Sequence, residues 1–295
     1  MAAHAVYDAV LGVGNALKQV MSSAFNANVN VIAGSASGAP DPSDYFIEET
    51  MPVAAFETFD VAGGLGILSI TAGLYVAAGT ITVPWNQRTN GGTFASGSAH
   101  FRINGTDALI VPTTISANQG DEGVGMGIAV HFLSTTGFAV PVTLSTAQAL
   151  ASQSFNAQYA FGPAYYGGSN VPECVGWAVN PGIVVEKSTT DGGIYPTRAY
   201  IVLRRPTIDL IFEDFDALSS FGVMHGAMTS AAVYGRKRSG SSTFVADATA
   251  EHLKFSFANG VSSTETIQAT GVNRGKLALR LHGEALTASA ASAIP

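Results

Sequence analysis

Apolar and polar residues alternate along two segments near the end of the chain, residues 252–257 (HLKFSF) and 276–282 (KLALRLH). A period of two is typical of a β-strand that buries one face. We therefore expect the apolar residues of both segments to point into the core, and the residues between them, including His252 and Arg280, to point outward. The expected inward set is Leu253, Phe255, Phe257, Leu277, Leu279 and Leu281.

The first half shows the same alternation at residues 100–103 and 127–133. Short runs rich in Asn, Gly and Ser, at residues 90–92, 238–242 and 259–260, are typical of hairpin turns between strands. These features predict a mainly β protein, with two tandem copies of an antiparallel β-sandwich or barrel-forming domain and a short helix in each copy. The expected inward residues of the first half are Phe101, Ile103, Ile128, Val130 and Phe132.

A short acidic and aromatic motif occurs once in each half. FETFD spans residues 56–60, and FEDFD spans residues 212–216, 156 positions later. A tyrosine and then a proline precede each motif at nearly the same spacing, with Tyr45 in the first half and Tyr200 in the second. Blocks that recur in one order at nearly one offset indicate an internal duplication. The motif residues are Phe56, Glu57, Phe59, Asp60, Phe212, Glu213, Phe215 and Asp216.

The duplication divides the chain into three parts. Residues 1–145 are expected to form the first β domain and residues 178–295 the second. Residues 146–177 are small, aromatic and Gly-rich, and we expect them to form a connector. The first domain is expected to begin with a helical arm, because apolar residues recur there at helical spacing, although two glycines weaken it. The apolar residues of this arm are Val6, Val10, Val13, Leu17 and Val20.

Composition and charge exclude several classes of protein. Hydrophobic residues make up 47% of the chain and charged residues only 12%, which excludes disorder and favours a surface covered by neighbouring subunits. The net charge of −7 comes from residues 1–145, which carry 3 Lys and Arg against 10 Asp and Glu, so no basic field exists to hold nucleic acid. The uncharged stretch 61–83 could span a membrane, but its counterpart contains His225 and small polar residues, so we expect no membrane insertion.

Candidates for catalysis are sparse. The six histidines lack the spacing of metal ligands, and Cys174 is the single cysteine. His100 and His252 occupy aligned positions on outward strand faces, and we expect a surface or interface role for them. The motif carboxylates could bind a cation, but their place at a strand end favours helix capping or turn formation. We expect no enzyme activity and no catalytic, cofactor-binding or metal-binding residues.

A basic cluster lies at the expected tip of a hairpin in the second half. It consists of Arg236, Lys237 and Arg238. The acidic first half of a neighbouring subunit would complement this charge, so the three residues are candidate inter-subunit or inter-ring contacts.

The order of strand, short helix, hairpin and two closing strands, written twice, resembles the tube protein of long-tailed, siphovirus-like bacteriophages. The blocks that carry the resemblance are the two acidic motifs, HFRING with GMGIAVHFL, and HLKFSFANG with GKLALRLHG, within residues 28–145 and 178–295. The resemblance implies a structural virion protein whose sheets join across subunits into a β-barrel around a channel for the genome. Many such proteins have one tube domain and form hexamers, so two domains per chain predict a trimeric, pseudo-hexameric ring.

The resemblance also implies partners and a location. The chain would self-associate into stacked rings and contact other tail proteins, while DNA would pass along an acidic lining without sequence-specific binding. It would be assembled in the cytoplasm of a host bacterium and reside in the virion tail. Two alternatives stay open. One is another virion component, such as a tail terminator, a baseplate hub or a capsid decoration protein, and the other is a secreted carbohydrate-binding or hydrolytic β-sandwich.

Overall fold

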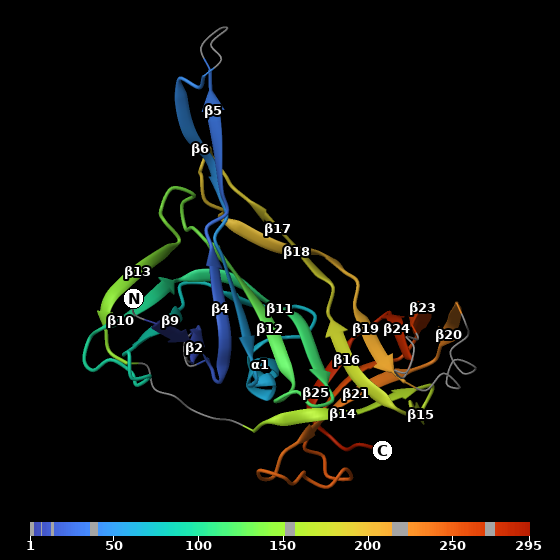
Figure 1. Cartoon of the computed structure of the whole chain (residues 1–295). Helices are drawn as coiled ribbons and strands as arrows, with labels where there is room; N and C mark the ends of the chain where they lie inside the picture. The colour runs from blue at the N-terminus through green and yellow to red at the C-terminus, as the bar shows by residue number, and fades with distance from the viewer. Residues whose placement is uncertain are drawn as a thin grey trace.

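The protein is built mainly of antiparallel strands, as predicted, with one short helix, α1 (Val61–Ile67), in the described part of the chain (Figure 1). The helix expected in the second half would follow the FEDFD motif, at residues that lie outside those described. The computed structural model describes residues 3–6, 8–12, 15–35, 41–150, 157–213, 224–268 and 275–295.

The strands fall into two halves along the chain. The strands of the first half are β1 (Ala3–Val6), β2 (Ala9–Leu11), β3 (Ala16–Leu17), β4 (Val20–Asn26), β5 (Val29–Gly34), β6 (Asp44–Thr50), β7 (Val53–Thr58), β8 (Leu74–Val76), β9 (Ile81–Arg88), β10 (His100–Gly105), β11 (Asp107–Asn118), β12 (Gly125–Leu133) and β13 (Val142–Gln148). The strands of the second half are β14 (Tyr159–Tyr166), β15 (Ser169–Asn170), β16 (Cys174–Asn180), β17 (Ile183–Ser188), β18 (Arg198–Arg204), β19 (Thr207–Phe212), β20 (His225–Met228), β21 (Ala231–Lys237), β22 (His252–Phe257), β23 (Gly260–Gln268), β24 (Lys276–Gly283) and β25 (Thr287–Ser292).

One ten-stranded sheet, the large sheet, contains strands from both halves. Its order is β20-β23-β24-β19-β16-β11-β12-β7-β4, and β8 pairs with β11 beside this path. The halves meet where β11 pairs with β16, with Ile115 opposite Val179 and Asn118 opposite Gly176. The large sheet is therefore continuous across the boundary between the halves.

Two smaller sheets complete a sandwich-like arrangement, one in each half. The first has the order β13-β10-β9-β2-β3 with β1 on β9, and the second has the order β15-β14-β21-β22-β25. One cluster of buried apolar side chains joins the large sheet to both smaller sheets, and it includes Ile110 and Ile81 in the first half and Leu279 and Phe255 in the second. Burial of this kind is the main favourable contribution to folding.

The strand pairings of the two halves correspond. β7 lies between β4 and β12, as β19 lies between β16 and β24. β11 pairs with β12 and β8, as β23 pairs with β24 and β20. β10 lies between β9 and β13, as β22 lies between β21 and β25. Each strand of one half can thus be compared with a counterpart in the other, with Phe56 opposite Ile128 and Phe212 opposite Leu277.

Each half also carries a two-stranded hairpin that leaves the large sheet. β5 and β6 form the first hairpin and β17 and β18 the second. Figure 1 shows β5–β6 projecting away from the body, whereas β17–β18 runs across towards the base of β5–β6. The two hairpins emerge from corresponding places, since each connects β4 to β7 or β16 to β19.

The expected N-terminal helical arm is wrong. The described residues there form β1 to β4, and Ala9, Leu11, Leu17 and Val20 are buried. Gly12, directly after β2, has φ +98, a conformation that favours glycine. Short strands joined by tight turns placed apolar residues at intervals that imitate a helical period.

The expected connector at residues 146–177 is also wrong. β14 and β15 lie within this range, and β13 and β16 overlap its ends. Its small and aromatic residues, such as Tyr159 and Ala164, are buried because β14 pairs with β21 in the second smaller sheet. The boundary placed at residue 178 would cut through β16 (Cys174–Asn180).

Candidate functional site: the open face and free edges of the large sheet

The large sheet buries one face throughout, while the other is mostly exposed or half-buried, except at β11, where Leu109 and Val111 are buried as well. Along β24, Leu277, Leu279 and Leu281 are buried, while the residues between them are exposed or half-buried, which confirms the predicted alternation. Along β7, Phe56 is buried and Glu57 is exposed. We call the other side of the large sheet the open face. It carries Glu57 on β7, His131 on β12, Asp209 and Ile211 on β19, and Arg280 and His282 on β24.

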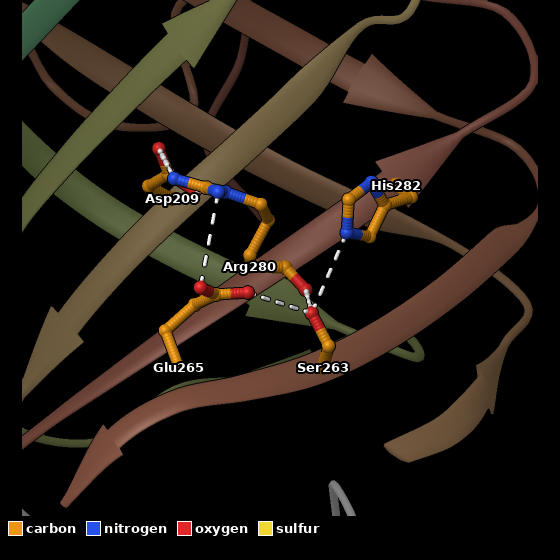
Figure 2. A network of polar contacts seen from close by, with 5 residues as sticks. All are labelled: Asp209, Ser263, Glu265, Arg280 and His282. Atoms are coloured by element: carbon orange, nitrogen blue, oxygen red, sulfur yellow. Dashed lines mark hydrogen bonds and ion pairs between the residues drawn. The ribbon is translucent and has the colours of Figure 1, made fainter. Parts of the chain in front are cut away.

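A polar network occupies the open face of the second half (Figure 2). Arg280 Nε donates to Asp209 Oδ1 at 2.7 Å, and Arg280 Nη1 lies 3.8 Å from Glu265 Oε2. Ser263 donates to Glu265 Oε1 at 3.1 Å, and its hydroxyl lies 3.4 Å from His282 Nε2. The hydrogen bond to Asp209 raises the pKa of the Arg280 guanidinium above its ordinary value. Two carboxylates surround one guanidinium, so the Arg280 network carries a net negative charge at neutral pH.

The first acidic motif caps a helix, as its position at a strand end predicted. Asp60 Oδ1 accepts from the backbone N–H of Gly63 at 3.0 Å, at the N-terminus of α1. Asp60 Oδ2 accepts from the backbone N–H of Lys18 at 3.1 Å, which ties the segment before β4 to the helix. Both oxygens of this buried carboxylate therefore serve the local fold.

The second motif is described only in part. Phe212 is fully buried at the end of β19, and Glu213 follows it in a bend. Phe215 and Asp216 lie outside the described residues, and so does residue 214.

His100 and His252 are both fully buried, contrary to the expected surface role. They nevertheless make equivalent hydrogen bonds in the two halves. His100 Nδ1 accepts from the backbone N–H of Gln87 at 3.0 Å, and His252 Nδ1 accepts from that of Lys237 at 3.1 Å. The loop before β22 folds back over its histidine, with Ala246 O at 3.0 Å from His252 Nε2. Strand alternation cannot reveal such a cover.

The basic cluster finds acidic partners within its own chain. Arg236 Nη2 lies 2.8 Å from Asp247 Oδ2, and Lys237 pairs with Glu251. Arg238 Nη2 donates to the backbone carbonyl of Glu122 at 3.3 Å. Partly exposed ion pairs of this kind contribute at most about 1 kcal/mol to stability. The role of Arg236, Lys237 and Arg238 as inter-subunit contacts stays a prediction.

His131 lies beside a cavity beneath the second hairpin. The cavity has a volume of about 320 Å³, and its lining includes Thr113, Asn180 and Val185. Nδ1 of His131 is buried and has no hydrogen-bond partner. Burial, and secondarily the charge of Lys187, lower the pKa of His131 from 6.5 to about 4. The imidazole is therefore neutral at pH 7.

Acid should destabilise the protein through His131. Because the folded-state pKa of about 4 lies below the ordinary value of 6.5, the unfolded chain takes up the proton first as the pH falls. The stabilisation is present above pH 6.5 and is lost towards pH 4, by up to about 3 kcal/mol. Urea unfolding at pH 7.5, 5.5 and 4.5 should show that the free energy of unfolding falls less with acid for His131→Gln than for the parent chain. Parallel pH profiles of the two proteins would contradict this.

Among the described strands, the large sheet leaves the outer sides of β4 and of the later part of β23 unpaired. β4 pairs only with β7 among the described strands. β23 pairs with β20 as far as Ser263, and the next part of its outer side, Glu265–Gln268, is exposed and has no strand beside it within the described ranges. In the first half, β11 pairs with β8 over Ala108–Ile110 and then with β16 from Ile115. β23 thus corresponds to β11, but the part of β23 that corresponds to the β16-paired part of β11 has no described strand beside it.

A groove lies beside the free edge of β4. Its volume is about 510 Å³, and it lies between the edge of the large sheet and the first smaller sheet. Phe25 is half-buried there, whereas its counterpart on β16, Trp177, is 2% exposed. Leu144 on β13 is 62% exposed. The groove is lined by Ser23, Ala24, Phe25, Trp85, Ile103, Val142, Thr143 and Leu144.

The sequence did not single out the groove, the free edges or the first hairpin. A signal for the hairpin was present, because Tyr45, Phe46 and Ile47 follow one another and thus put apolar side chains on both faces of one strand. The edges had no local signal, since they depend on which distant strands pair.

The fold and site together define a mainly β protein with a sandwich-like arrangement of antiparallel sheets and one open sheet face. Comparison with protein-family models and with curated proteins finds no match for this chain. In the described ranges, no group of three or more His, Cys, Asp or Glu side chains could hold a metal ion. No helix among the described residues is long and apolar enough to cross a membrane, and the stretch 61–83 is divided among α1, β8 and β9.

Proposed function

We propose that this chain is a structural virion protein that joins edge to edge into closed rings, which stack into the tail tube of a long-tailed bacteriophage. The observation that carries the proposal is the junction of β11 with β16. It links one half to the other as neighbouring subunits of a ring would be linked. The free edges of β4 and β23 would repeat that junction between chains.

The two edges belong to the counterparts of the strands that meet at the internal junction. β4 is the counterpart of β16, and β23 is the counterpart of β11. Pairing β4 of one chain with β23 of the next therefore continues the large sheet with the same kinds of neighbour. An exposed strand edge is a template for such pairing, and closing a sheet into a barrel removes its edges.

The open face suits the inside of a channel for DNA. A large part of it is made of small side chains, and its Arg280 network has a net negative charge, so phosphates would be repelled. Such a lining lets a duplex slide without sticking. The small residues at alternate positions of β7, β12, β16 and β24 are Ala55, Gly127, Ala129, Ala178 and Ala278.

The correspondence of the halves favours a ring of three chains. We propose that the halves are copies of one domain, so that three chains present six similar units around the axis. In this proposal the rings also meet other tail proteins at the ends of the tube. The chain assembles in the cytoplasm of its bacterial host and remains in the virion.

Electron microscopy of the purified chain tests this function. We expect concentrated protein in negative stain to form hollow tubes or rings, and end-on averages to show threefold symmetry with six lobes. A ring of six chains would overturn the stoichiometry, and rings that never stack would favour a tail terminator or another virion part. Monomers at every concentration would overturn the tube function, and glycan binding would then be the next assay.

A further inference from the structure

The second hairpin is docked onto the first half of the same chain. The backbone N–H of Ser134 donates to Pro196 O at 2.7 Å, and that of Tyr195 donates to Gly137 O at 3.0 Å. Pro196 and Tyr195 lie in the loop between β17 and β18, and Ser134 and Gly137 lie in the connection between β12 and β13. Residues 134–141 of the first half are therefore the receptor of the second hairpin.

The described second half offers no matching receptor to the first hairpin. β24 and β25 correspond to β12 and β13, but only residues 284–286 connect them. The exposed fractions of Tyr45, Phe46 and Ile47 on β6 are 65%, 51% and 50%. An isolated two-stranded hairpin is at best marginally stable in water, and large apolar side chains in water indicate a surface that a neighbour covers. We therefore looked for a surface elsewhere on a second copy that fits β5–β6.

The first hairpin is acidic. Residues 29–50 contain four carboxylates and no lysine or arginine. Asp41 lies nearest the tip of the hairpin, is exposed, and takes part in no hydrogen bond or ion pair with the described residues. Asp44 Oδ1, by contrast, accepts from the backbone N–H of Tyr45 at 2.8 Å. Asp41 therefore presents a free carboxylate at the far end of the hairpin.

A pocket lies at the opposite end of the large sheet. Its volume is about 460 Å³, and we call it the Arg238 pocket; Gln19, Gln158 and Ser239 also line it. β4 begins directly after Gln19 and leads at its other end into β5, so the pocket and the hairpin lie at the two ends of one strand. Figure 1 shows β5–β6 at the top and the loop that follows β21, in orange, at the bottom.

Arg238 lacks a carboxylate partner among the described residues. Its neighbours Arg236 and Lys237 both form ion pairs, whereas Arg238 Nη2 donates to the backbone carbonyl of Glu122. Nε of Arg238 and Oε1 of Gln19 are buried and have no hydrogen-bond partner in the same ranges. Buried polar groups are rarely left unpaired, and a guanidinium binds a carboxylate strongly. The Arg238 pocket therefore suits an acidic side chain.

The first half contains a natural reference for Arg238. Arg88 is its counterpart, because each arginine forms an isolated β-bridge with a phenylalanine six positions later, Phe94 or Phe244. The guanidinium of Arg88 lies over the ring of Phe94, 5.3 Å from its centroid. Phe244 is 48% exposed. The two arginines thus occupy equivalent loops, and Arg88 already has a partner for its charge within the chain.

We propose that the β5–β6 hairpin of one copy of this chain enters the Arg238 pocket of a copy in the next ring, with Asp41 paired with Arg238. This inference rests on the stacked rings proposed above and names the contact between them. The strand ends of a sheet closed into a barrel form its two rims, so the hairpin and the pocket lie at opposite rims. Complementary surfaces at opposite rims allow identical rings to add head to tail without limit.

Charge-reversal variants test the pairing. We expect Asp41→Lys and Arg238→Asp each to raise the concentration needed for tube growth roughly tenfold, measured by pelleting at low salt, while sedimentation velocity still shows rings. The double variant should return to within about twofold of the parent chain. Arg88→Asp is the matched control and should stack normally, because its loop is equivalent but its guanidinium lies over Phe94.

The outcomes separate this inference from the proposed function. If the parent chain forms tubes and a single variant stacks unimpaired, or the double variant stays as unstacked as the single ones, the pairing is wrong and the tube stands. A loss in Arg88→Asp as large as that in Arg238→Asp would equally overturn it. If the parent chain forms no tubes, the function and the inference fail together. Thermal melting of each variant shows whether a loss of tubes reflects misfolding, and recovery in the double variant excludes that explanation.

Discussion

Leu144→Asp is expected to abolish ring formation while the single chain folds as before. Leu144 is 62% exposed on β13, so replacing it should cost the isolated chain little. Its counterpart on β25 is Ala288, since Leu144 lies opposite Ile103 and Ala288 lies opposite Phe255. β25 contacts α1 of the first half at the internal junction, and Ala288 is partly buried against the core. In a ring, Leu144 would be covered in the same way by the next chain.

Burial of an unpaired carboxylate makes this effect large. Leaving a charge unpaired in an interface costs several kcal/mol, which corresponds to at least a hundredfold loss of association. Sedimentation velocity and electron microscopy should show only monomers for Leu144→Asp, with an unchanged melting temperature.

The control for Leu144→Asp places the same charge on the open face. Ile211→Asp alters a side chain that is 38% exposed on β19 and would face the water-filled channel of a ring. We expect this variant to form rings. Rings from Leu144→Asp, or their loss in Ile211→Asp alone, would show that the edge beside β13 is not the interface.

Trp177→Ala should destabilise the folded chain by about 3–5 kcal/mol, since it empties a large, fully buried site. The indole lies on β16 at the internal junction, with its ring centroid 6.0 Å from that of Phe255. The matched variant is Phe25→Ala, because Phe25 is the counterpart of Trp177 on β4. Its ring centroid lies 6.3 Å from that of Phe132. Phe25 is half-buried, so its loss should cost the single chain about 1–3 kcal/mol.

Urea unfolding followed by circular dichroism measures both losses without relying on tryptophan fluorescence. The difference between the variants reports how much of the burial at Trp177 comes from the β11–β16 junction. Under ring-forming conditions the two variants should lose more similar amounts of stability, because a neighbouring chain would cover Phe25 and make its removal more costly. Equal losses in the isolated chains would show that the two sites are not distinguished by the junction.

The sequence predicted the features that depend on near neighbours. The alternation at residues 252–257 and 276–282 identified the core side of β22 and β24 for every apolar residue named. The position of Asp60 at a strand end predicted its capping role at α1. These predictions succeeded because strand faces and helix caps are set by residues a few positions apart.

Where distant parts of the chain meet, the predictions from sequence failed. His100 and His252 were placed outside because strand alternation contains no information about a loop folding over the outer face. The prediction of a connector at 146–177 failed because small and aromatic residues are found in connectors and in strands alike. Composition does not reveal that β14 pairs with β21.

The pattern of residues along the chain was enough to predict the mainly β class, the inward residues of its clearest strands, the turns and the motif in each half. The tertiary structure was needed to show that β11 pairs with β16, that β4 and the later part of β23 have no outer neighbour among the described strands, and that one hairpin is docked while the other projects. The reason is physical. Facing and capping follow from local geometry, whereas edges and docking depend on which of several similar strands, far apart in the chain, become neighbours.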